Sequence, residues 1–282
     1  MTLAVALVAV ALAAPALRAE EARREQLTAI LGARPVEIQL LEAQLQGKQS
    51  QQLLGVTFYT GTLKGRKVVL AVSGAGKVNA AMTTTLLLDH FQPTEVLLTG
   101  VAGGINPELG TGDIVLGEKT AQHDFGVVTV QGYKPGATKD PSGKSNPQFF
   151  PGAAQLLSVA EAAAKEAALD KMPTTQGERL PRVRRGVIVA GDVFVVSQAK
   201  TTELHQDFGA DAVEMEGAAV AQVCWQQNVP CLVIRCISDK ADVMANKDFR
   251  KFVHAAAGNS AKLTLAIIER LAKSSAEPAS AR

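Results

Sequence analysis

The sequence predicts an α/β protein: a single domain of three layers, α/β/α, with a central mixed, largely parallel sheet. Several apolar runs of strand length are continuously hydrophobic, which is typical of strands that are covered on both faces. These runs alternate with stretches of helical periodicity and end in Gly, Ser or Asp. The chain has 282 residues, 47% of them hydrophobic, which is enough for one large core.

The elements follow in chain order from their patterns. Strands are expected in apolar runs bounded by turn residues, at 27–33, on both sides of a turn at Lys64-Gly65, and at 95–104, 184–195 and 230–239. Helices are expected where apolar residues recur at helical spacing, at 34–46, 79–91, 153–168 and 245–273. The run GADAVEMEGAAV within 209–230 predicts the start of a buried helix, and the Pro-, Gly-, Ser- and Lys-rich segment 132–150 predicts an exposed excursion.

Charge and cysteine content exclude several classes of partner. The 29 basic and 27 acidic residues leave a formal net charge of +2, which is too small to attract nucleic acid. The cysteines Cys224, Cys231 and Cys236 lie in one apolar region, a spacing that fits neither a zinc site nor a disulfide framework. We therefore expect no metal, no cofactor and no nucleic-acid partner.

The N-terminus predicts export. Residues 1–19 are apolar and alanine-rich, and they contain Ala14-Pro15-Ala16 as an A-x-A cleavage pattern. We expect a signal peptide at 1–19, a folded domain at 27–274, a disordered tail at 275–282, and a periplasmic or secreted protein without membrane contact in its mature form. Because no Lys or Arg precedes the apolar core, the alternative is a cytoplasmic protein with an uncleaved apolar tail.

Small and acidic residues follow the predicted strands. The carboxyl ends of parallel strands share one edge, which should gather the loops after Leu31, Val72, Leu98, Val189 and Ile237. Three acids, Glu37, Glu216 and Asp239, are expected there, and such a set suits general acid and base catalysis on a neutral or cationic ligand. Acids at helix starts are more often caps or dipole partners, and we assign that role to Glu214 and Asp242.

Six segments carry a resemblance to a known family. These segments are GARPVE, SGAGKVNAAMTTTLLLDHF, LLTGVAGGINPELGTGDIVLGEKTAQHDFG, GVIVAGDVF, AVEMEGAAVAQVC and VIRCISDKAD. In order and spacing they resemble the bacterial 5'-methylthioadenosine/S-adenosylhomocysteine nucleosidases, a branch of the purine nucleoside phosphorylase superfamily. The resemblance implies a nucleoside phosphorylase-like fold, hydrolysis of the N-glycosidic bond of adenine nucleosides, a role in methionine salvage, and a homodimer whose partner subunit completes the 5' pocket.

The resemblance also implies catalytic roles for individual residues. Asp239, with Ser238 beside it, would protonate the purine imidazole nitrogen, so that adenine leaves as a neutral base. Its departure creates a ribosyl oxocarbenium ion, which an anionic site stabilises. Glu37 would hold and deprotonate the attacking water with help from Arg235.

Binding roles follow in the same way. Glu216 would accept the ribose hydroxyls, and Met215 would pack against the sugar. Phe194 would stack on the base, the backbone at Val195 would contact its edge, and Phe249 would cover the 5' side. From the residues alone, core packing is the preferred interpretation of Phe194 and Phe249.

Three positions depart from the family pattern. Val101 stands where the nucleosidases usually have Ser, Arg34 where they usually have Met, and Ala75 where they have a bulkier aliphatic residue. The resulting 5' pocket is larger and more cationic than a methylthio group requires. It suits homocysteine, another carboxylate-bearing group such as that of aminofutalosine, or phosphate.

Two alternative functions stay open. Phosphorylases of the superfamily carry an Arg on the strand that here contains Leu98, and a carboxylate at Glu37 would repel phosphate, so water is the favoured nucleophile. A purine nucleoside phosphorylase remains one alternative. A catalytically weak, exported nucleoside-binding or storage protein is the other.

Overall fold

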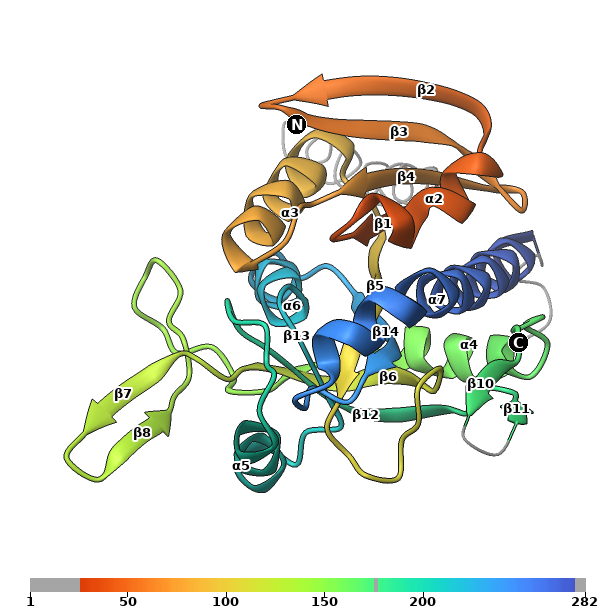
Figure 1. Cartoon of the computed structure of the whole chain (residues 1–282). Coiled ribbons are helices and arrows are strands. Elements are labelled where there is room, and N and C mark those ends of the chain that lie inside the picture. The colour runs from red at the N-terminus through yellow and green to blue at the C-terminus, as the bar shows by residue number, and fades with distance from the viewer. Residues whose placement is uncertain (1–25, 175–176, 277–282) are drawn as a thin grey trace, which may run out of the picture.

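A mixed sheet lies between layers of helices in the computed structural model, which describes residues 26–174 and 177–276 (Figure 1). Across the described part of the sheet the strands run in the order β13 (Ala212–Glu214), β12 (Val183–Ala190), β6 (Ile114–Gln122), β14 (Cys231–Asp239), β5 (Glu95–Gly104), β1 (Leu27–Gly32), β4 (Arg66–Val72), β3 (Val56–Leu63) and β2 (Gln46–Leu53). The short strand β9 (Phe150–Pro151) pairs with β6. The predicted α/β class with a central mixed sheet is confirmed.

Parallel and antiparallel pairings occupy different parts of the sheet. The strands β4, β1, β5 and β14 are parallel neighbours, and so are β6, β12 and β13. These two groups meet in antiparallel pairing between β6 and β14, and a second antiparallel contact joins β13 to the carboxyl end of β5. The sheet therefore curls until β12 and β13 reach the edge where β1, β4, β5 and β14 end.

Helices cover both faces of the sheet. One layer comprises α2 (Pro35–Ala43), α4 (Ala154–Ala164) and α7 (Ala245–Ala276), and the other comprises α3 (Lys77–Phe91) and α6 (Gly217–Gln226), with α5 (Gln198–Phe208) packing beside β12. Alternate residues of β1 serve the two cores: Ile30 packs with α2 and α7, whereas Leu31 packs with α3 and α6. Burial on both faces is why this strand is continuously apolar.

Most predicted elements occur close to their expected bounds. The strands at 27–33 and 95–104 and the turn at Lys64-Gly65 are present, and α3 begins two residues before the expected Asn79. The helix expected over 153–168 ends at Ala164. The prediction for the run 209–230 was wrong in detail. The extended segment β13 precedes the helix, which begins only at Gly217.

Two short antiparallel hairpins lie outside the main sheet. One comprises β10 (Met172–Thr174) and β11 (Gly177–Arg179), and the other comprises β7 (Gly126–Thr129) and β8 (Gly132–Pro135). The second hairpin projects from the body of the molecule, on the side where α3 and α6 lie (Figure 1). The exposed excursion predicted from residue 132 therefore begins earlier, at Gly126.

The ends of the chain fall mainly outside the described residues. The signal peptide expected at 1–19 lies there entirely, as do residues 277–282 of the expected tail. Helix α7 continues to Ala276, two residues beyond the expected end of the domain. Within the described residues, no helix combines the length and apolar character needed to cross a membrane.

Candidate active site

A cavity of about 510 Å³ lies where the strands end. Its wall includes residues that follow β1, β4, β12 and β14, the end of β5, the β13–α6 junction, and the first turns of α7. The expected gathering of loops at one edge is therefore present. The loop after Val189 was expected at this edge because its strand would run parallel to the others. Instead β12 runs antiparallel to β14, and its end lies at the edge because the sheet curls.

All but one of the predicted site residues line this cavity. They are Arg34, Glu37, Ala75, Phe194, Val195, Met215, Glu216, Ser238, Asp239 and Phe249. The exception is Arg235, which is completely buried behind the cavity wall.

Glu37 is held rigidly at the start of α2. Pro35 occupies the first turn, where its missing N–H costs nothing. One carboxylate oxygen of Glu37 accepts the backbone N–H groups of Ala33 at 2.6 Å and Arg34 at 3.0 Å, and the other accepts the N–H of Val101 at 3.1 Å. Burial raises the pKa of Glu37, while the charge of Arg235 and these N–H donors oppose the rise. The side chain thus serves as a helix cap and also faces the cavity.

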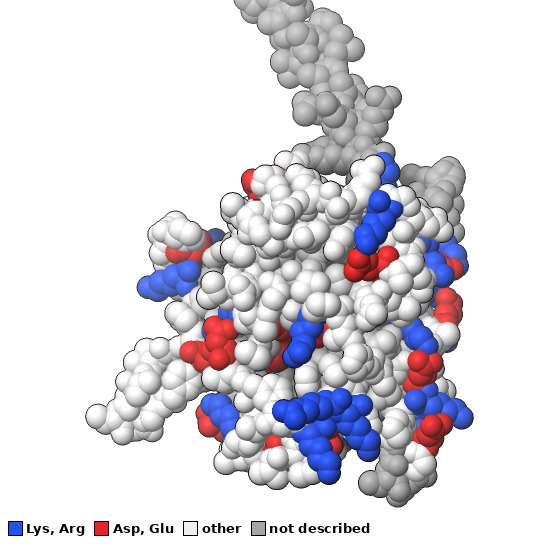
Figure 2. Space-filling model, turned by 45° about the horizontal axis from the view of Figure 1, so that its top comes forward, with Lys and Arg blue, Asp and Glu red and all other residues white. Residues whose placement is uncertain are grey.

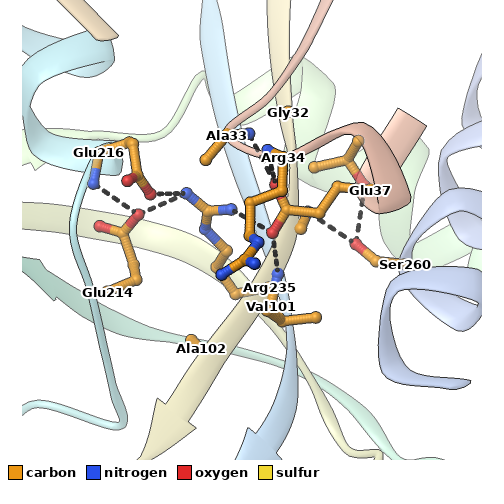
Figure 3. Close-up of polar contacts among 12 residues, drawn as sticks. Gly32, Ala33, Arg34, Glu37, Val101, Ala102, Glu214, Glu216, Arg235 and Ser260 are labelled. Carbon is orange, nitrogen blue, oxygen red and sulfur yellow. Dashed lines mark hydrogen bonds and ion pairs between the residues drawn. The ribbon is translucent and has the colours of Figure 1, made fainter. Parts of the chain in front are cut away.

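Arg235 links the acids of the site (Figure 3). Its Nη2 donates to Glu214 Oε2 at 2.5 Å and to Glu216 Oε2 at 3.1 Å, while its Nη1 lies 3.8 Å from Glu37 Oε1. The contact between Arg235 and Glu37, which was expected to assist catalysis, is therefore the longest of the three. Arg235 positions carboxylates from behind, and its Nε and Nη1 have no hydrogen-bond partner among the described residues.

The three carboxylates outnumber the single guanidinium. Burial raises the pKa of Glu216 to about 7, and the charges of Glu214 and Glu37 add to the rise against the opposing effect of Arg235. One oxygen of Glu216 accepts the backbone N–H of Gly76 at 2.8 Å, while the other faces Arg235. This carboxyl therefore titrates near neutrality.

Glu214 has the capping role predicted for it and a second role that was missed. Its carboxylate accepts the backbone N–H groups of Glu216 at 3.0 Å and Gly217 at 2.8 Å, which lack partners at the start of α6. The same carboxylate is the closest ionic partner of Arg235. Asp242 also caps as predicted, since it accepts the N–H of Met244 at 2.8 Å just before α7.

Gly100 makes room for this cluster. A Cβ atom at this position in β5 would overlap Arg235 Nη1 and would lie 2.5 Å from Glu37 Oε1. Glycine is therefore required for the close approach of the two side chains to the strand. The sequence offered one signal of this requirement, which is the run of small residues in TGVAGG.

Asp239 lies at the end of β14 and lines the cavity. Its carboxylate accepts the N–H of Ala241 at 2.9 Å and the hydroxyl of Ser238 at 2.8 Å. Burial raises the pKa of Asp239, and these two donors oppose the rise. A carboxyl with a raised pKa is suited to donate a proton.

Two aromatic rings form a wall above the acids. The rings of Phe194 and Phe249 meet edge to face with centroids 5.8 Å apart, and Phe194 is 45% exposed. Core packing is therefore wrong for Phe194. The loop that carries it is fixed by Asp192, which accepts the N–H of Lys77 at 2.7 Å and donates its own N–H to Asp124 at 2.8 Å.

Several lining residues were missed from the sequence. Asn246 and Arg250 join Phe249 on the wall, and their spacing of three and four residues places all three on one face of α7. The helical pattern alone gave no sign that this face meets a cavity. Among the described residues, no group of His, Cys, Asp or Glu is arranged to hold a metal ion.

Comparisons with known proteins identify the family of the chain. The phosphorylase superfamily model matches residues 28–269. The 5'-methylthioadenosine/S-adenosylhomocysteine nucleosidase of Anoxybacillus flavithermus is 38% identical over 87% of this chain and 99% of its own, and that of Mycobacterium tuberculosis is 36% identical over 85% and 95%.

Solved structures show the same relationship. The Neisseria meningitidis nucleosidase in complex with methylthio-immucillin-A is 37% identical with a TM-score of 0.75, over 86% of this chain and 99% of its own. Futalosine hydrolase of Helicobacter pylori is 32% identical with a TM-score of 0.76, over 87% and 98%. The chain therefore belongs to the phosphorylase superfamily and, within it, to the 5'-methylthioadenosine/S-adenosylhomocysteine nucleosidases.

Proposed function

We propose that this protein hydrolyses the N-glycosidic bond of adenine nucleosides such as 5'-methylthioadenosine and S-adenosylhomocysteine, releasing adenine. The observation that carries the proposal is the convergence of Glu37, Glu216 and Asp239 on one cavity with an aromatic wall. Membership of the nucleosidase family supports the same reaction.

Each acid has a distinct part in the proposed reaction. Asp239 gives a proton to the imidazole nitrogen of the purine, so the bond to ribose breaks and adenine leaves as a neutral base. The ribosyl cation that forms faces Glu216, which accepts the ribose hydroxyls, and an anionic surrounding stabilises such a cation. Glu37 takes a proton from the water that attacks the anomeric carbon, so water is consumed and a free sugar is the second product.

The cavity favours water over phosphate as nucleophile. Leu98, at the position where phosphorylases of the superfamily carry an arginine, is completely buried in the core and does not line the cavity. Glu37 faces the cavity as a fully buried carboxylate, and a phosphate dianion beside it would be repelled.

Partner completion of the site is a further part of the proposal. Apolar side chains are exposed on the β7–β8 hairpin and on α3, namely Val127, Val128, Val130, Val78 and Met82. Exposed apolar patches of this kind mark interaction surfaces. Because α3 begins two residues after Ala75 of the cavity wall, a second copy seated on this surface would adjoin the pocket.

The first test distinguishes hydrolysis from phosphorolysis. Purified protein should release adenine from 5'-methylthioadenosine and S-adenosylhomocysteine at the same rate with and without phosphate. Glu37→Gln should abolish release while nucleoside binding stays measurable by calorimetry, because the water and not the base depends on this acid. Cleavage that requires phosphate, or full activity of the variant, would contradict the assignment.

Replacement of Asp239 by Asn tests the general acid. The amide keeps the acceptor for the Ala241 N–H but cannot protonate the purine, so kcat should fall by about 10²–10⁴-fold with little change in melting temperature. A parallel loss of turnover and thermal stability would show instead that Asp239 is structural.

Replacement of Glu216 by Gln tests how the raised pKa of this acid affects the stability of the folded protein. The folded protein holds the Glu216 proton up to a pH of about 7, whereas the unfolded chain releases it near 4.5. Wild type should therefore lose stability relative to Glu216→Gln as pH rises from about 5 to about 8, by up to roughly 3 kcal/mol. Turnover should fall in the same variant. Thermal melts at both pH values, with the exposed Glu118→Gln as control, measure the difference; a pH-independent difference would refute the raised pKa.

Analytical ultracentrifugation tests the proposed homodimer. Wild type should sediment as a dimer, and Val128→Glu on the hairpin should sediment as a monomer with reduced adenine release. Leu180→Glu, which alters an exposed apolar side chain elsewhere, should stay dimeric. A monomeric wild type at micromolar concentration would rule the interface out.

A further inference from the structure

The arginines of the described chain fall into two groups. In the first group each guanidinium has a carboxylate within 4 Å, and its members are Arg66, Arg179, Arg182, Arg184, Arg185, Arg235 and Arg270. Figure 2 shows basic and acidic side chains lying side by side at several places on one face. The remaining two, Arg34 and Arg250, have no ion-pair partner among residues 26–174 and 177–276.

Both unpaired arginines line the same cavity, although they come from different elements. Arg34 immediately precedes α2 and donates its backbone N–H to Glu37, so its side chain leaves the chain within one turn of that acid. Arg250 belongs to the face of α7 that also carries Asn246 and Phe249. Arg34 and Arg250 therefore bring two positive charges to the cavity wall that no carboxylate of the described residues pairs with.

The two aromatic rings indicate where the charge of Arg34 lies relative to a bound nucleoside. The Arg34 guanidinium stands over the Phe249 ring, 5.3 Å from its centroid, and Phe249 in turn contacts Phe194. In the proposed function the base lies at Phe194 and Asp239, and the ribose lies at Glu216. The 5' substituent would then lie beside Arg34 and Phe249. The cavity is thus anionic along its floor and cationic where this substituent leaves it.

We propose that Arg34 and Arg250 together bind a carboxylate at the end of the 5' substituent, and that the enzyme therefore prefers substrates of the S-adenosylhomocysteine type. The inference rests on the proposed function, which fixes the direction of the nucleoside. Guanidinium groups bind carboxylates through paired, charge-assisted hydrogen bonds. Both side chains are exposed. A bound substrate carboxylate would supply their counter-charge and shield the contact from water.

The test compares substrates that differ in one group. kcat/KM is measured for S-adenosylhomocysteine and for its decarboxylated analogue, which keeps the chain and the ammonium group, in wild type, Arg34→Met, Arg250→Met and the double variant. The ratio of the two values should fall about tenfold in each single variant and further in the double variant. Lys247→Met, which removes an exposed charge from α7 outside the cavity lining, should leave the ratio unchanged.

Other outcomes separate the inference from the function on which it rests. If wild type releases adenine from 5'-methylthioadenosine but the ratio is unchanged in the double variant, this inference alone is overturned. If the protein releases adenine from no nucleoside, both the proposed function and this inference are wrong. Stronger competition by adenosine 5'-phosphate than by S-adenosylhomocysteine, lost in Arg34→Met, would show that phosphate is the anion and overturn the carboxylate assignment.

Discussion

A single buried guanidinium surrounded by three carboxylates is the constraint on which the site depends. Arg235 cannot neutralise Glu37, Glu214 and Glu216 at once, so the excess negative charge must be relieved by backbone N–H donors and by a retained proton. Most of these donors come from the starts of helices α2, α3 and α6, and one, the N–H of Val101, comes from β5. The positions of these helices are therefore tied to the charge cluster, and the cluster in turn presents an anionic floor to a cationic transition state.

The topology of the sheet delivers these groups to one place. Arg235 in β14 lies beside Gly100 in β5 in the parallel register, so the long side chain crosses the strand at the position where no Cβ obstructs it. Glu37 follows β1, the other neighbour of β5. The two glutamates next to Met215 arrive through β13, which closes the curled sheet against the end of β5. Residues nearly 200 positions apart in the sequence thus meet through strand order alone.

The sequence was sufficient to predict the α/β class, the gathering of loops at one edge, and the three acids placed there, because apolar strands and the residues that follow them are local signals. The other residues of the proposed site came from the resemblance to the nucleosidases. Where it failed, the missing information was not local. The strand β2 is polar and exposed along almost its whole length, so no hydrophobic alternation marks it. The place of Arg235 behind the carboxylates depends on its strand register. The lack of an ion-pair partner for Arg250 within the described part of the chain depends on its surroundings in space rather than on its neighbours in sequence.

The helix α7 spans two very different environments. Its later turns are packed into the core, and its end is fastened where Arg66 donates to the Leu271 carbonyl at 3.2 Å. Its first turns carry exposed residues, and only there does it border the cavity. Local opening of a helix end requires far less free energy than global unfolding, since few apolar contacts are lost. Opening these first turns, which border the cavity, would thus cost less free energy than opening the buried turns after Val253.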